Sequence, residues 1–247
     1  MLRILGLWLA LSCFVLGQTG KPPLVTDPPK DTSIPSIVQS FAAKETDLKE
    51  ARERYTYTRE VTLRASCKGA QPGVYHLIVD VGFDNKGNRS EKVKAADSTL
   101  QCIQITREDL DRFRDQFLFV LTTNDIQDYQ INFVGQQQQD GSRFYVFDVS
   151  PVSTRPDKEY FEGRIWVDAR DLIIVRSHGT ITAKLEKKRK AQENLFSAVT
   201  TWSVQTDGRY WFPSYSRASD VLHFPDGDVQ IDEVVQLTNY KAVAQQK

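Results

Sequence analysis

The stretch from Tyr160 to Gly179, YFEGRIWVDARDLIIVRSHG, alternates in a way that strongly restricts its fold. Side chains of a β-strand point to opposite faces in turn, so a period of two indicates a strand over Tyr160–Asp168. A short polar turn and a second run, Leu172–His178, rich in β-branched residues, then predict an antiparallel hairpin. One predicted face carries Phe161, Gly163, Ile165 and Val167, and the other carries Tyr160, Glu162, Arg164 and Trp166.

The second face of this hairpin is typical neither of a buried face nor of a solvent-exposed face, because it carries both Trp166 and Arg164. A sheet with one packed face and one mixed face suits a concave surface that accepts an apolar ligand. An ordinary two-sided sheet is the alternative.

The same period recurs along most of the chain, starting at Tyr55. Turn signals such as Asp140-Gly141 and Asp207-Gly208 separate the alternating runs. Together they predict roughly ten to eleven antiparallel strands, arranged as a curved meander that is closed or half closed.

Two segments have helical signals. Ser33 and Pro35 mark the start of an amphipathic helix of about four turns, whose charged residues, Glu45 among them, fall off its apolar stripe. Thr106 to Asp109 resembles a capping box and predicts a second, short helix. The apolar run 117–121 after it is either a buried strand or a mobile element of a binding pocket. The stripe of the first helix comprises Ile34, Ile37, Val38, Phe41 and Leu48.

Residues 1–17 combine one early positive charge with a short apolar run, which is typical of a secretory signal peptide cleaved before Gln18. Cys13 raises lipid anchoring as the less favoured alternative, because no leucine stands three residues before it. Residues 18–33 are rich in proline and predict an extended or disordered leader. We therefore expect an exported protein that is soluble after cleavage.

Removal of the signal leaves two cysteines, Cys67 and Cys102. An even number in an oxidising compartment favours a disulfide, and two separately buried thiols are the alternative. The histidines have no metal-ligand spacing, so we expect neither a metal nor another cofactor. The balance of 32 basic and 32 acidic residues argues against nucleic-acid binding.

No catalytic motif is recognisable. The chain has no GxSxG, HExxH or phosphate-binding glycine loop, and Asp168 and Asp171 flank a turn where aspartate is favoured for its conformation. These observations predict a protein that is not an enzyme. Its aromatic residues, Trp202 and Trp211 among them, suit an amphipathic ligand, although they could equally fill a closed core.

Three features together resemble the LolA/LolB-like periplasmic lipoprotein carriers: the N-terminal amphipathic helix, the meander and the hairpin pattern F-x-G-x-I-W-V-D-x-x-x-L-I-I-V-R. The resemblance is closer to the acidobacterial type of outer membrane lipoprotein-sorting protein. The resemblance covers about Ser33–Tyr240 and is clearest in PSIVQSFAAKETDLKEARERYTY, the hairpin and GRYWFPSYSRASDVLHF. It implies a mainly β fold: an unclosed antiparallel half-barrel with an N-terminal helix and short helices covering a hydrophobic cavity for acyl chains. The family's lid-locking arginine has no clear counterpart, and the family does not require the two cysteines.

We therefore expect a half-barrel domain over residues 34–241, with a short tail at 242–247, that binds acyl chains of lipoproteins or other lipids in the bacterial periplasm. Transfer partners would lie at the inner or outer membrane. The alternative is a cell-envelope module that binds protein without lipid cargo. The candidate cavity residues are Phe119, Phe161, Ile165, Val167, Trp202 and Trp211.

Overall fold

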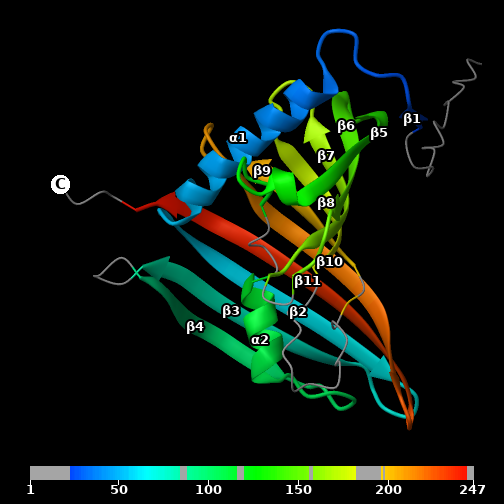
Figure 1. The fold of residues 1–247 in the computed structure, drawn as a ribbon. Coiled ribbons are helices and arrows are strands. Elements are labelled where there is room, and N and C mark those ends of the chain that lie inside the picture. Colours follow the sequence, from blue (N-terminus) through cyan, green and yellow to red (C-terminus); the bar gives the residue numbers. More distant parts are fainter. Residues whose placement is uncertain are drawn as a thin grey trace, which may run out of the picture.

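The protein is built on a single antiparallel sheet of eleven strands that does not close into a barrel (Figure 1). The computed structural model describes residues 23–83, 88–115, 120–155, 158–181, 196 and 198–243. The spatial order of the strands is β1-β5-β6-β7-β8-β9-β10-β11-β2-β3-β4, which leaves β1 and β4 at the two edges. The strands are β1 (Leu24–Val25), β2 (Tyr55–Cys67), β3 (Gly73–Phe83), β4 (Arg89–Ser98), β5 (Tyr129–Gln139), β6 (Ser142–Pro151), β7 (Phe161–Asp168), β8 (Ile174–Ile181), β9 (Val199–Gln205), β10 (Trp211–Phe224) and β11 (Gly227–Ala242).

This architecture confirms the predicted mainly β, unclosed half-barrel with an N-terminal helix. The chain runs through the sheet in sequence order from β5 to β11, and two pairings, β11 with β2 and β1 with β5, join distant parts of the chain. Within the expected leader, Leu24 and Val25 form the short strand β1 on β5. The predicted signal peptide and Phe119 lie outside the described residues.

Helix α1 (Ile34–Arg52) begins as the sequence predicts. The backbone N–H of Ser36 donates to the Ser33 hydroxyl at 3.3 Å, and Pro35 occupies the first turn, where its missing N–H is not needed. Ile37, Phe41 and Leu48 are buried against the sheet. Glu45 is also buried, at 5% exposure, so its predicted place among the solvated charges was wrong.

Helix α2 (Arg107–Asp115) opens with the predicted capping box. The backbone N–H of Asp109 donates to the Thr106 hydroxyl at 3.2 Å, and the Asp109 carboxylate accepts from the Thr106 backbone N–H at 2.9 Å. Figure 1 shows α1 and α2 covering the same face of the curved sheet over different strands. A short 3-10 helix, η1 (Ile126–Asp128), leads into β5.

Register partners of an antiparallel sheet share a face, which allows both faces to be traced across the molecule. One row, here called the inner face, runs through Phe147, Ile165, Ser177, Thr201, Ser216, Val235, Val61 and Leu77. The helices cover this face. The opposite, outer face carries Val146, Trp166, Arg176, Trp202 and Tyr215 in the neighbouring row.

The hairpin β7–β8 follows the predicted alternation from Phe161 onward. The place predicted for Tyr160 on the opposite face was wrong, because Tyr160 precedes the strand and is buried in the same cluster as Phe161. Phe161 and Ile165 point inward and are buried, whereas Arg164 on the outer face forms a two-fold contact with Asp148 at 2.7 and 2.9 Å. The Asp168 carboxylate accepts backbone N–H groups of Arg170 and Asp171, both at 2.9 Å. The conformational role predicted for this turn aspartate is confirmed.

Candidate functional site

The inner face is divided into two apolar halves. On the β5–β8 half, Phe147 and Ile165 pack against α1; on the β2–β3 half, Val61 and Leu63 pack beside α2. Between these halves one row across β8, β9 and β10 presents the hydroxyl side chains of Ser177, Thr201 and Ser216, whereas Val199 and Ala218 in the next row belong to the β2–β3 half. The two halves are therefore separate apolar surfaces with separate covers.

Helix α1 covers its half tightly. Ile37 and Phe41 are fully buried, and the ring of Phe41 meets that of Phe147 edge to face at 5.9 Å between centroids. Further along the helix, Leu48 and Ala51 pack against Tyr55 and Phe212. The close ring contact between Phe41 and Phe147 therefore holds α1 firmly against this half of the sheet.

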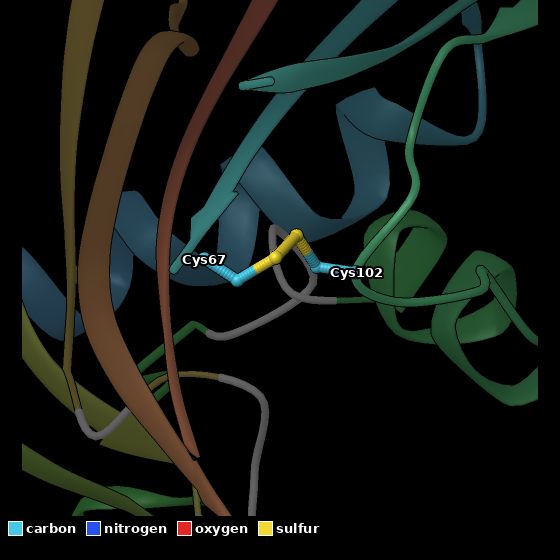
Figure 2. Close-up of a disulfide and its surroundings, with 2 residues drawn as sticks. All are labelled: Cys67 and Cys102. Atoms are coloured by element: carbon cyan, nitrogen blue, oxygen red, sulfur yellow. A yellow bond between two sulfur atoms is a disulfide. The ribbon is translucent and has the colours of Figure 1, made fainter. Parts of the chain in front are cut away.

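Helix α2 covers the other half through a much smaller contact. Phe113 is 1% exposed, whereas Leu110 is 37% exposed, and Phe113 is the one fully covered side chain among those of α2 that the structure describes. The segment that precedes α2 is fixed to the end of β2 by a disulfide between Cys67 and Cys102, with Cα atoms 6.2 Å apart (Figure 2). The disulfide predicted from the sequence is thus present. It joins a short helix covalently to the surface that the helix covers.

Three of the predicted cavity residues, Phe161, Ile165 and Val167, lie together on the half beneath α1. All three are buried, at 4% exposure or less. Gly163 and Gly179 face each other next to Phe161; a Cβ on either glycine would stand 2.9 or 2.8 Å from its ring. These two glycines therefore provide the room for Phe161 inside the hairpin.

Trp202 lies on the outer face, away from those three residues. Arg176 is stacked between two indoles there, 4.2 Å from the ring centre of Trp166 and 5.6 Å from that of Trp202. The Trp202 ring also contacts Tyr215, with centroids 5.3 Å apart. Trp202 thus belongs to a row of aromatic rings with Arg176 between two of them. The alternation of the sequence alone did not show on which face of the sheet it lies.

Trp211 lies at the start of β10 and lines a cavity of about 300 Å³ beside the second half of α1. Leu48, Ile173 and Tyr210 also line this cavity, but most of its remaining lining is charged. The charged residues are Lys44, Glu45, Asp47, Glu50, Arg54 and Arg209. The structure therefore does not join the predicted residues into a single apolar cavity.

Glu45 is the buried carboxylate of α1. Burial raises its pKa from 4.5 to about 7, and the positive charge of Arg52 and a backbone hydrogen bond at Leu121 offset only part of this rise. The sequence gives no sign of this burial, because Glu45 stands in the polar run Lys44–Asp47, off the apolar stripe of the helix.

We expect Glu45 to make stability depend on pH. Its folded pKa, about 7, lies above the unfolded value of 4.5, so unfolding releases a proton between these pH values. The free energy of unfolding should therefore fall by up to about 3 kcal/mol as the pH rises from 4.5 to 7, and the slope from this group should vanish above 7. Urea denaturation of the wild type and Glu45→Gln at several pH values measures this. The glutamine variant should gain stability relative to wild type across that window, and a constant difference would contradict the assignment.

The described part of the chain contains no group of three or more side chains suited to hold a metal ion. His178 Nδ1 lies 2.7 Å from the Thr200 hydroxyl, and His223 Nδ1 lies 2.7 Å from an Asp228 carboxylate oxygen at an exposed hairpin end. None of the described helices is long and apolar enough to span a bilayer.

Comparison with known proteins gives matches among solved structures only; no family model and no curated protein matches the chain. A DUF1329 family protein from Desulfovibrio piger shares 12% identity at a TM-score of 0.37, covering 82% of this chain and 92% of the other. A LolA superfamily protein from Nitrosomonas europaea shares 11% at 0.35, covering 83% and 95%. A Vibrio parahaemolyticus domain with a provisional assignment to outer membrane lipoprotein sorting shares 11% at 0.38, covering 82% and 92%. At these scores the matches assign no activity, ligand or partner to this chain.

Proposed function

We propose that the protein is a non-catalytic carrier that binds an acyl chain on the inner face of its sheet, beneath α2. The observation that carries the proposal is the uneven covering of that face. Among the described residues, the largely apolar surface on β2, β3 and β11 also holds the buried Glu233. It packs against a single fully covered side chain of the nine-residue helix α2, Phe113, and otherwise against Phe196 and the partly buried Leu100, Ile103 and Ile105 that precede the helix.

A simple energy comparison supports displacement of α2 by a ligand. Burial of roughly ten methylene groups of an acyl chain gives about 8 kcal/mol, whereas exposing Phe113 costs about 3 kcal/mol. The disulfide at Cys102 keeps the preceding segment attached when the helix lifts. The ligand can therefore replace the helix without unfolding the sheet.

The same comparison favours the α2 half over the α1 half. An acyl chain beside Phe161, Ile165 and Val167 would have to lift α1, which loses the buried contacts of Ile37, Phe41 and Leu48. Phe161, Ile165 and Val167 remain candidates for a second, more costly site. Trp211 is a candidate for the mouth beside α1, and Trp202 for an outer contact; Phe119 stays a prediction.

Export to the periplasm, lipoprotein acyl chains as cargo and transfer partners at the inner or outer membrane form part of this proposal. They are motivated by the signal-like residues 1–17 and by the resemblance of the hairpin to the lipoprotein carriers. The sheet itself is compatible with any ligand that presents a long apolar chain.

Titration with a fluorescent long-chain fatty acid tests the proposal through a matched pair of variants. Phe113→Ala weakens the cover over the β2–β3 half, so it should tighten ligand binding about tenfold, because less free energy is spent in opening the site. Phe41→Ala removes an equally buried ring beneath α1 and should leave the affinity unchanged. Circular dichroism and urea denaturation establish that both variants are folded at the assay temperature.

The outcomes separate the alternatives. Tighter binding in Phe41→Ala alone would move the site to the surface around Ile165 and Val167. Absence of uptake by the wild type and both variants would overturn the carrier function and favour a protein-binding module of the cell envelope.

A further inference from the structure

An arginine cluster lies on the inner face at the end of the proposed acyl site. Arg59 belongs to β2 and has Leu237 and Val79 as its register partners, and Val61 follows it on the same face. Its side chain is 3% exposed, although the neighbouring strand positions are apolar. A charged group in such a place needs a compensating partner.

The compensation within the cluster is incomplete. Glu91 on β4 accepts from Arg59 at 3.3 and 2.9 Å and also from Arg89 at 3.2 Å, so one carboxylate serves two guanidinium groups. The Nε of Arg59 is buried without a hydrogen-bond partner among the residues that the structure describes. Two positive charges therefore share one negative charge at this point.

A third arginine adds to the imbalance. Arg52, in the last turn of α1, has no carboxylate within ion-pair distance among the described residues. Burial lowers its pKa; Glu45, Tyr240 and Tyr57 act in the opposite direction, and Arg89 adds to the lowering. The nearest carboxylate influence, Glu45, is itself only partly ionised near neutral pH because its pKa is about 7.

Two tyrosines complete the site. The Arg89 guanidinium donates to the Tyr57 hydroxyl at 2.9 Å, and the Tyr57 ring lies 5.2 Å from that of Tyr240 between centroids. Both rings also pack against the apolar cluster of the β2–β3 half. Arg89 is 30% exposed at its side chain, whereas Arg59 is buried, so the cluster leads from solvent to the apolar surface.

We infer that Arg52, Arg59 and Arg89, with Tyr57, bind the oxyanion head group of an acyl amphiphile, a phosphate or a carboxylate. Guanidinium groups match both oxyanions in geometry and form charge-assisted hydrogen bonds with them. An apolar face that ends in unbalanced arginines is complementary to a molecule with an apolar chain and an anionic end. The inference rests on the proposed function and specifies its ligand class.

Binding of three amphiphiles of equal chain length tests the head-group site: a lysophosphatidate, a fatty acid and an uncharged monoacylglycerol. Isothermal titration calorimetry should give at least one of the two anionic ligands about tenfold tighter binding than the uncharged one. Arg52→Gln should abolish this preference and leave the affinity for the monoacylglycerol unchanged. Arg89→Gln, at the exposed end, is the second variant in case Arg52→Gln is poorly folded.

Arg54→Gln is the matched control, because Arg54 lies two residues further along, is exposed and lines the cavity beside Trp211 instead. It should keep the full preference. Equal affinity for charged and uncharged ligands would overturn the head-group site while leaving the acyl carrier intact, whereas no binding of any amphiphile would overturn both. Inorganic phosphate that binds as tightly as the lysophosphatidate would show a site for a free anion and would also overturn the inference.

Discussion

Replacing Cys67 and Cys102 together with alanine should lower the free energy of unfolding by about 4 kcal/mol. The bond closes a loop with a sequence separation of 35 residues, and a loop of that length loses roughly this much chain entropy when it is cross-linked in the unfolded state. The loop contains β3 and β4, so their pairing with β2 should become less stable. Urea denaturation followed by circular dichroism measures the change.

Reduction of the wild type with dithiothreitol provides the control for this first prediction. The reduced wild type and the double variant should have the same denaturation midpoint, since both lack the same cross-link. A double variant as stable as the oxidised wild type would show that the bond contributes no net stability.

Replacing Phe41 with alanine should lower the free energy of unfolding by about 3–5 kcal/mol. The ring is fully buried and packs edge to face on Phe147, so its removal leaves a cavity between α1 and the sheet. Loss of this contact weakens the attachment of α1 to the β5–β8 half of the sheet.

Phe113→Ala is the matched comparison for Phe41→Ala, because both rings are almost completely buried. We expect a smaller loss, about 1–2 kcal/mol, since α2 can detach locally while the sheet remains folded. Global denaturation, together with hydrogen exchange of the two helices, measures both effects. Equal losses would show that α2 is as fully part of the cooperative core as α1, which argues against its role as a movable cover.

The sequence predicted those parts of the fold that depend on residues close together in the chain. The alternation in β7–β8, the Ser33 cap of α1 and the Thr106–Asp109 capping box each depend on residues a few positions apart. The pairing of β11 with β2 is different, because it joins Tyr55 to Ala242 across almost the whole described chain. No local pattern specifies such a partner.

The candidate site was less predictable, because its key residues depart from simple patterns. Arg59 stands in the apolar phase of β2, between Tyr57 and Val61, and this misplaced charge was the available signal for the arginine cluster. Glu45 gave no comparable signal, since glutamate is common on the exposed side of a helix. Trp202 was predicted to line the cavity because of its aromatic ring, and only its register with Arg176 places it on the outer face.

The position of a bound acyl chain tests the central claim most directly. A fatty acid with a nitroxide at its chain end, titrated into isotopically labelled protein, broadens the amide resonances of nearby residues. The acyl-carrier account predicts broadening at Val61, Leu63 and Val79 on the β2–β3 half, with Trp166 and Trp202 on the outer face unaffected. Broadening confined to the outer face, or none at ligand concentrations that saturate a known fatty-acid carrier, would contradict it.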